Sequence, residues 1–159
     1  MKRLILIAIL SFLIYPSAAL CGTRYQDECI TDMVWVETRG ATQTDHWFSI
    51  RTVLNRIRYP KDFGGTPCDV IRHHVTSKGK VRYEFQWARH MPKIPRSHPL
   101  YRKMFHLVSV VRQTAPKGCE KDILFFRRPG FHTGVKGAHL CAVGKMYYFA
   151  KNMKGSTHS

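Results

Sequence analysis

A single carboxylate, Glu37, closes an otherwise apolar stretch, MVWVETRG, in a chain that has only ten Asp and Glu residues. Ile30, Met33, Val34 and Glu37 follow the spacing of one helical face, so the carboxylate points where the apolar side chains point. Burial disfavours an ionised carboxyl group and raises its pKa, so that it can hold a proton near neutral pH. Such a group can act as a general acid, for instance toward a glycosidic oxygen. The alternative is a Glu37 that is solvated or paired with Arg39.

Two helices are expected in the first half of the chain, and the first of them carries this carboxylate. Asp27 is a good N-cap residue and Gly40 is placed to end a helix, so we predict a helix from about Asp27 to Arg39. The next helix is predicted from about Thr44 to Arg58, where turn-forming residues follow. Its expected inward stripe consists of Trp47, Ile50, Leu54 and Ile57.

The second half of the chain adds a third helix and a minor β part. A short helical turn is expected near Asp69–His74, and Lys78–Pro95 is expected to be a long loop or a short strand. Ser97 as N-cap and Pro99 in the first turn open the third helix. The inward stripe of that helix consists of Met104, Leu107, Val108 and Val111. The segments DILFF and KMYYFA predict short strands, so the expected fold class is α+β, mainly helical, in a single domain.

The N-terminus has the layout of a secretory leader. Two basic residues precede an apolar run from Leu4 through Ile14, and small residues follow it. We predict that residues 1–19 are a signal peptide, cleaved after Ala19, or an uncleaved signal-anchor, and that residues 20–159 form one domain. A buried N-terminal helix is the weaker alternative, because the run has no polar face to turn toward water. The domain is therefore expected to be exported, periplasmic or extracellular, with a transient membrane tether if the leader is retained.

The net charge of the chain restricts the class of partner that it is expected to bind. The chain has 26 Lys and Arg against ten Asp and Glu, a formal net charge of +16. Two of the basic residues lie in the leader, so the remaining 140 residues carry +14. Such an excess favours an anionic partner, which can be nucleic acid, acidic lipid headgroups or a polyanionic cell wall.

The cysteines indicate disulfides rather than a metal site. They are widely scattered, and no two of them form a Cys-x-x-Cys pair. The five are Cys21, Cys29, Cys68, Cys119 and Cys141. In an exported chain we expect two bridges with one cysteine left over, and Cys21 is the expected odd one because it adjoins the cleavage site. Buried thiols in a reducing compartment are the alternative.

Four motifs occur in an order that is similar to one protein family. They are VWVETRG, IRTVLNRIRYPKDFGGTPCDVI, YEFQWA and CAVGKMYYFA, and they span about Ile30 to Phe149. The chain resembles the spore cortex-lytic SleB-type cell wall hydrolase family. Those proteins have a helix ending in Glu-x-Arg-Gly, a V-L-N-R helix, a Cys before a V-I segment, a Phe-Ser-Trp-like motif and a closing Ile-Gly-x-x-x-Phe-Tyr segment. The resemblance implies a lysozyme-like fold and peptidoglycan glycan strands as substrate.

The resemblance also assigns roles to individual residues. It places Glu37 at the position of the family's catalytic glutamate and implies neither a metal nor a cofactor. The residues that it implies for substrate binding are Asn55, Arg56, Phe85, Trp87 and Tyr148. Structural alternatives stay open for them, since the Asn-Arg pair can tie helices together through ion pairing and the aromatic side chains can belong to the core.

The chain also departs from the family pattern. Ala41 stands where the family usually has an acidic residue, and Glu84 and Gln86 replace the Gln and Ser that flank the family's Phe. The segment DILFFRRPGFH keeps the family's Gly-Ala-Thr-x-x-His-like segment poorly. These differences indicate a divergent member and leave the position of any second catalytic group open.

The scarcity of acidic residues bears on the mechanism. A glycosidase that uses water ordinarily needs two carboxylates, whereas a lytic transglycosylase can work with one. This scarcity, together with the family's resemblance to lytic transglycosylases that use one glutamate, favours a lytic transglycosylase that cleaves the MurNAc-GlcNAc bond with Glu37 alone. Glu84 is the candidate second carboxylate and Asp122 the next, although solvated or ion-paired roles are the simpler interpretation of both.

A small cationic wall-degrading enzyme with a leader fits a phage endolysin or a bacterial wall-remodelling enzyme, acting as a monomer. The main alternative is a secreted cationic protein that disrupts membranes or walls by charge, without catalysis. A nuclease is disfavoured, and no nucleic acid partner is expected. The adjacent His73 and His74 point in different directions, and no metal-binding spacing accompanies them.

Overall fold

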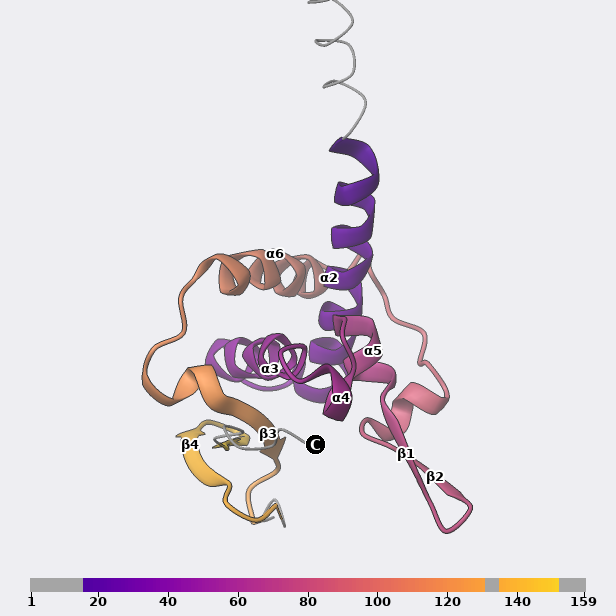
Figure 1. Cartoon of the computed structure of the whole chain (residues 1–159). Helices are drawn as coiled ribbons and strands as arrows, with labels where there is room; N and C mark the ends of the chain where they lie inside the picture. Colours follow the sequence, from indigo (N-terminus) through magenta and orange to yellow (C-terminus); the bar gives the residue numbers. More distant parts are fainter. Residues whose placement is uncertain (1–15, 131–134, 152–159) are drawn as a thin grey trace, which may run out of the picture.

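The computed structural model describes residues 16–130 and 135–151, with side chains from residue 23 onward. Its first element is helix α2, Pro16–Thr38, which extends beyond the body of the domain at its N-terminal end (Figure 1). The predicted end of this helix is confirmed to within a residue, but the predicted start is wrong. Asp27 is not an N-cap, because the helix already begins at Pro16 and continues through Gly22 to Asp27. Asp27 is instead buried within the helix, and its carboxylate accepts a hydrogen bond from Arg112 (Nε to Oδ1, 2.7 Å).

The predicted leader lies mostly outside the described residues, which begin at Pro16. The part that is described, Pro16–Ala19, already belongs to α2, so the helix runs through the predicted cleavage position. Among the described residues, no helix combines the length and the apolar character needed to cross a bilayer.

Helix α3, Gln43–Arg56, begins at a capping box in which Thr42 and Asp45 exchange side-chain and backbone hydrogen bonds. Its extent agrees with the predicted Thr44–Arg58 to within two residues. The predicted inward stripe is only partly correct, since Ile50 is fully buried whereas the other three members are half-buried. The buried face of α3 is largely polar, and it comprises Asp45, His46, Ser49, Arg51, Thr52, Asn55 and Arg56 beside Ile50 and Val53.

Two short helices, α4 (Pro60–Phe63) and α5 (Pro67–Arg72), lead from α3 into a hairpin. The predicted helical turn near Asp69–His74 corresponds to α5, which begins and ends two residues earlier. The hairpin consists of strands β1 (His74–Ser77) and β2 (Lys80–Tyr83), and it projects from the body (Figure 1). Lys78 and Gly79 both have positive φ, as a two-residue type I′ turn requires.

The segment predicted as a long loop or a short strand contains both β2 and the 3-10 helix η1 (Gln86–Arg89). Helix α6, Pro99–Gln113, then follows, and its predicted inward stripe is confirmed because all four residues are buried. The predicted cap is wrong by one residue. His98, not Ser97, is the N-cap, and its ring accepts a hydrogen bond from the Leu100 backbone.

After the 3-10 helix η2 (Gly118–Asp122), the C-terminal part of the chain forms a three-stranded antiparallel sheet. The strands are β3 (Ile123–Arg127), β4 (His139–Val143) and β5 (Tyr147–Ala150), in the order β3-β5-β4. The two strands predicted from DILFF and KMYYFA are confirmed as β3 and β5. Strand β4 was not predicted.

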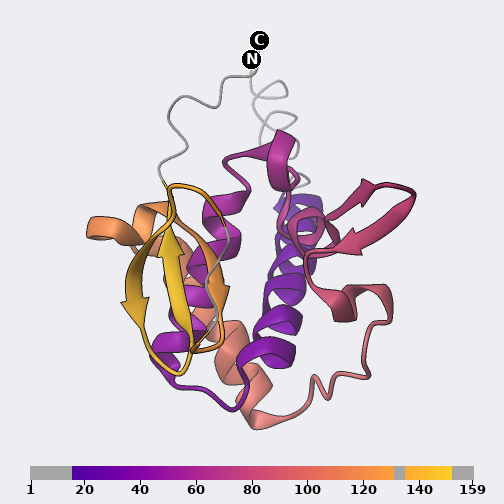
Figure 2. The same ribbon diagram turned by 90° about the horizontal axis from the view of Figure 1, so that it is seen from below.

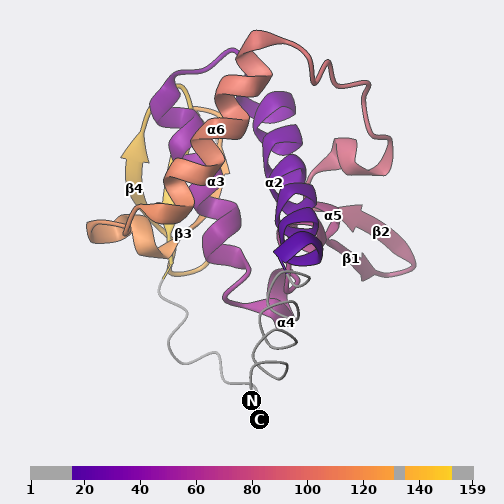
Figure 3. The same ribbon diagram turned by 90° about the horizontal axis from the view of Figure 1, so that it is seen from above.

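Helices α2, α3 and α6 pack together and enclose the core, and the three-stranded sheet covers α3 on the side opposite α6 (Figures 1 and 3). All of these elements provide fully buried apolar side chains, among them Ile30, Met33, Val34, Ile50, Val53, Met104, Val108, Val111 and Leu124. The protein is therefore an α+β domain that is mainly helical, as predicted from the sequence.

Two disulfides tie the domain together, and they involve the four cysteines expected to pair. Cys29 of α2 joins Cys68 of α5, and Cys119 of η2 joins Cys141 of β4. Cys21 lies in the part of α2 whose side chains are not described. Disulfides are typical of proteins that fold in an oxidising compartment.

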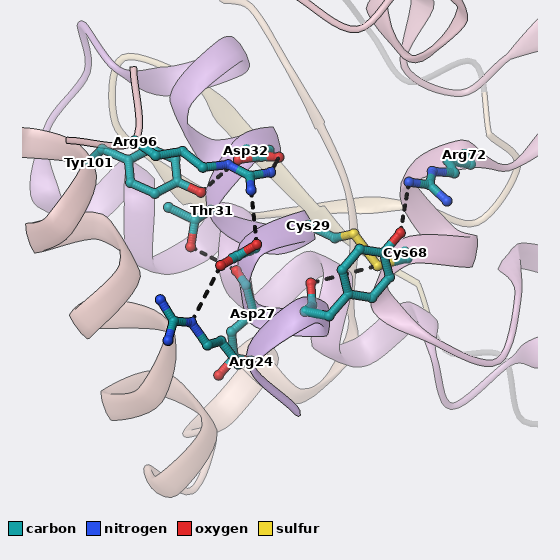
Figure 4. A network of polar contacts seen from close by, with 11 residues as sticks. Arg24, Asp27, Cys29, Thr31, Asp32, Cys68, Arg72, Arg96 and Tyr101 are labelled. Carbon is teal, nitrogen blue, oxygen red and sulfur yellow. Dashed lines mark hydrogen bonds and ion pairs between the residues drawn. A yellow bond between two sulfur atoms is a disulfide. The ribbon is translucent and has the colours of Figure 1, made fainter. Parts of the chain in front are cut away.

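A polar network holds the segment before α6 against α2 (Figure 4). Arg96 donates to Glu28 and to Asp32 (2.9 Å each), and Tyr101 donates to the second oxygen of Asp32 (2.6 Å). Burial, together with the hydrogen bond to Asp32, raises the pKa of Tyr101. Ion pairs with exposed groups contribute little individually, but this network fixes the chain that returns from η1 to the core.

Candidate active site

An open cleft of about 1290 Å³ lies between the β1–β2 hairpin and the three-stranded sheet. One wall is formed by residues 81–87 with Arg89, and the other by residues 125–128 with Met146. Val36 and Glu37, at the C-terminal end of α2, line the cleft between these walls. Figure 2 shows the hairpin and the sheet on opposite sides of α2.

Glu37 is a partly buried carboxylate in this cleft, as the helical spacing predicted. Its Oε1 accepts a hydrogen bond from the indole Nε1 of Trp87 at 2.7 Å. Burial raises the pKa of Glu37 above its ordinary value, although the Trp87 hydrogen bond and the nearby charge of Arg128 both lower it. No ion pair holds Glu37 among the described residues, so the Arg39-paired alternative is not supported. A carboxyl group with a raised pKa keeps its proton to a higher pH than a solvated one does, as a general acid requires.

The end of α2 beside Glu37 is fixed by a buried histidine. His46 of α3 donates from Nε2 to the backbone carbonyl of Thr38 at 2.8 Å. The Nζ of Lys145, in the β4–β5 turn, donates to the carbonyl of Gly40 at 2.9 Å. These contacts tie α3 and the β4–β5 turn to the end of α2 and hold the segment that carries the carboxylate.

Trp87 lines the cleft and is half-buried. The contribution of its hydrogen bond to the pKa of Glu37 can be tested. The indole N–H stabilises the ionised carboxylate, so its removal in Trp87→Phe is expected to raise the pKa of Glu37 further. A general acid works in its protonated form, and activity falls as the pH rises through its pKa. The alkaline limb of the pH–rate profile should therefore move to higher pH in Trp87→Phe. An alkaline limb that stays in place or moves to lower pH would contradict this role of Trp87.

Arg56 and Glu84 both line the cleft, and they are paired with each other. The Nη2 of Arg56 lies 2.7 Å from Oε1 of Glu84, and Nε of Arg56 donates to the carbonyl of Leu124 at 2.7 Å. Arg56 is almost fully buried, and its guanidinium lies over the rings of Phe63, Phe85 and Phe125. This arrangement supports a structural role for Arg56. Glu84 is ion-paired, which is the simpler of the two roles considered for it from the sequence.

Two of the residues expected to bind substrate do not line the cleft. Asn55 is buried and donates from its amide to the carbonyls of Glu120 (2.7 Å) and Ile123 (2.9 Å), which ties α3 to η2 and β3. Tyr148 is fully buried, and its hydroxyl donates to the backbone carbonyl of Asp45 at 2.9 Å. Their polar groups are committed inside the fold, so we assign both residues structural roles.

Phe85 and Asp122 complete the set of predicted residues. Phe85 lines the cleft but is only 5% exposed, and its ring contacts those of Trp87 and Phe126. This burial supports the core alternative for Phe85. Asp122 lies at the end of η2, and it is not among the residues that line the cleft.

Sequence reasoning missed four cleft residues that share one property, an exposed guanidinium. They are Arg82, Arg89, Arg127 and Arg128. The composition indicated an excess of positive charge, but it could not indicate where that charge gathers. Arg127 and Arg128 lie in DILFFRRPGFH, the segment in which the family pattern is poorly kept.

The described residues contain no group of three or more His, Cys, Asp or Glu side chains that could hold a metal ion. No protein family model, no characterised protein and no solved structure matches the chain. The similarity to the SleB-type family and to the lysozyme-like fold therefore remains a prediction from the motifs.

Proposed function

We propose that the protein is a peptidoglycan-degrading enzyme that cleaves the MurNAc-GlcNAc bond, with Glu37 as its general acid. The observation that carries the proposal is a partly buried carboxyl group of raised pKa in an open cleft. The motif order that resembles SleB-type cell wall hydrolases supports the choice of substrate. Release of soluble fragments from purified peptidoglycan by the wild-type protein, and not by Glu37→Gln, tests the proposal.

Cleavage as a lytic transglycosylase is favoured because, among the described residues that line the cleft, Glu37 is the only carboxylate without an ion pair. The neutral carboxyl group of Glu37 donates its proton to the glycosidic oxygen as the bond to the muramic acid C1 breaks. The resulting carboxylate then accepts the proton of that sugar's own 6-hydroxyl, whose oxygen bonds to C1. A 1,6-anhydro ring forms, no water is consumed, and Glu37 is again protonated.

Glu84 provides a direct test of this one-carboxylate mechanism. Glu84→Gln is expected to lower the free energy of unfolding by about 2 kcal/mol, because it leaves the buried Arg56 without its charged partner. Fragment release by the folded variant should stay within about threefold of wild type, because Glu84 takes no part in the chemistry. The measurement is fragment release at a temperature where both proteins are folded. A loss of about a hundredfold or more would instead identify Glu84 as a second catalytic carboxylate.

An exported enzyme with two disulfides and a strongly cationic surface suits a substrate outside the cytoplasm. We propose that the protein acts as a monomer in the periplasm or outside the cell, as a phage endolysin or a wall-remodelling enzyme. A tether through residues 1–19 would hold it at the membrane before release.

The high net charge favours one competing function, a secreted cationic protein that disrupts membranes or walls without cleaving them. Such a protein needs no general acid, so its bacteriolytic effect should survive Glu37→Gln. The glycan-cleaving enzyme should lose both fragment release and lysis in the same variant.

A further inference from the structure

Four exposed arginines surround the cleft, and they come from both of its walls. Arg82 lies on the hairpin strand β2 and Arg89 at the end of η1. Arg127 is the last residue of β3 and Arg128 follows it directly. Among the described residues, none of the four side chains forms an ion pair or a hydrogen bond with a protein group.

These four differ from the fifth arginine of the cleft, Arg56, whose charge is buried and paired with Glu84. Among the described residues, the cleft therefore has four guanidinium groups that form no ion pair, and the charge of one of them, Arg128, also acts on Glu37. Like charges gathered around one cleft repel one another, and an anionic ligand would relieve that repulsion. A guanidinium has a planar fork of donors that matches a carboxylate or a phosphate in two parallel hydrogen bonds.

We propose that the cleft selects glycan strands whose peptide stems carry free carboxylates, and that it discriminates against strands of neutral sugars. This inference rests on the proposed glycan cleavage. In peptide-bearing peptidoglycan the lactyl group of each muramic acid is joined to a stem, so the free carboxylates stand beside the sugar backbone rather than on it. Arginines on both walls can meet such groups while the sugars lie along the cleft over Glu37.

Carboxylates are favoured over phosphates because each stem provides them at every muramic acid, on the same polymer that Glu37 cleaves. Phosphate groups occur on other wall polymers and on lipids, and these would have to be brought to the cleft separately. The substrates of the test are therefore freed of phosphate beforehand.

The test compares two forms of one substrate. Phosphate-free peptidoglycan is digested either intact or after its stem carboxylates have been converted to methylamides, and fragment release is measured as an apparent kcat/KM. The wild-type protein is expected to prefer the intact form by about tenfold or more. Equal rates on the two forms would overturn the selection for carboxylates but leave glycan cleavage standing. Failure to cleave either form would contradict the proposed function itself.

Substitutions of the arginines in each wall of the cleft test whether these residues cause the preference for stem carboxylates. Arg82→Gln/Arg89→Gln and Arg127→Gln/Arg128→Gln are each expected to lose about tenfold on intact peptidoglycan and little on the methylamide form. Arg128 also influences the pKa of Glu37, and an effect of that kind would appear equally on both substrates. Arg102→Gln/Lys103→Gln, on the exposed face of α6, removes the same charge away from the cleft and should keep the preference. A loss of preference in this control equal to that of the wall variants would overturn the inference.

Discussion

Replacement of Glu37 by glutamine is expected to reduce fragment release from peptidoglycan by about 10²- to 10⁴-fold, which is the typical contribution of a positioned general acid. Glutamine keeps the size of the side chain and can still accept the hydrogen bond that Trp87 donates at 2.7 Å. Its amide cannot transfer a proton to a leaving oxygen. The loss should therefore appear in the chemical step rather than in binding to the wall.

Stability provides the control for this variant. The raised pKa of Glu37 means that burial of its ionised form opposes folding. A neutral glutamine removes that cost at neutral pH, so Glu37→Gln should unfold at the same temperature as wild type or at a higher one. Retention of more than about a tenth of the activity in a folded variant would show that Glu37 is not the general acid.

The largest loss of stability is expected from Asp45→Ala, by about 4 kcal/mol in the free energy of unfolding. The Asp45 carboxylate is buried and accepts hydrogen bonds from the backbone N–H groups of Thr42 (3.0 Å), Lys145 (3.2 Å) and Met146 (3.1 Å). It thus joins the start of α3 to the β4–β5 turn, from which Met146 lines the cleft. Chemical denaturation measures the effect.

Asp69 offers a matched control for this substitution. It forms the same capping box with Thr66 at the start of α5, but its side chain is exposed and forms no hydrogen bond or ion pair with a distant segment among the described residues. Asp69→Ala is therefore expected to cost only about 1 kcal/mol, the usual contribution of a cap. Equal losses in the two variants would mean that the tie from Asp45 to the β4–β5 turn contributes nothing.

The contribution of Asp45 should also depend on pH. Burial alone would raise its pKa, but the hydrogen bonds from Thr42, Lys145 and Met146 outweigh burial and lower the pKa below the ordinary 3.8. The unfolded chain therefore takes up the proton first as the pH falls. The difference between wild type and Asp45→Ala should be complete above about pH 3.8 and shrink below it. A difference that is independent of pH would contradict this.

The position of Glu37 could be predicted because it depends on local spacing. Apolar residues repeat along α2, and Glu37 shares their face, so its partial burial follows from helical geometry alone. The partner of Glu37 could not be predicted. Trp87 reaches it from η1, far along the chain, and that contact exists only once the segment between α5 and α6 has folded beside the end of α2.

Helix α3 shows why apolar periodicity can mislead. Its apolar residues suggested the inward face, but Trp47, Leu54 and Ile57 are only half-buried. Asn55 and Arg56 are buried more deeply because their side chains satisfy backbone carbonyls of η2 and β3. A buried polar side chain needs such a partner, and the sequence does not show which distant carbonyl provides it.

Strand β4 escaped prediction for a related reason. HLCAV is a short edge strand, and Leu140 and Val143 are exposed on it. The strand lacks the strict alternation of a half-buried strand, because a bulge between Leu140 and Ala142 shifts its register. Its pairing with the neighbouring β5 and the Cys119–Cys141 disulfide hold it in place, and the disulfide joins it to η2, a more distant part of the chain.

Mass spectrometry of the soluble fragments from purified peptidoglycan tests the proposed chemistry most directly. Digestion by the wild-type protein should give muropeptides one water lighter than reducing muropeptides, because a 1,6-anhydro end forms without water. The same fragments should be absent with Glu37→Gln. Reducing ends would contradict the one-carboxylate mechanism and require a second group that activates water. The absence of any fragments would contradict glycan cleavage altogether and favour the cationic binding protein.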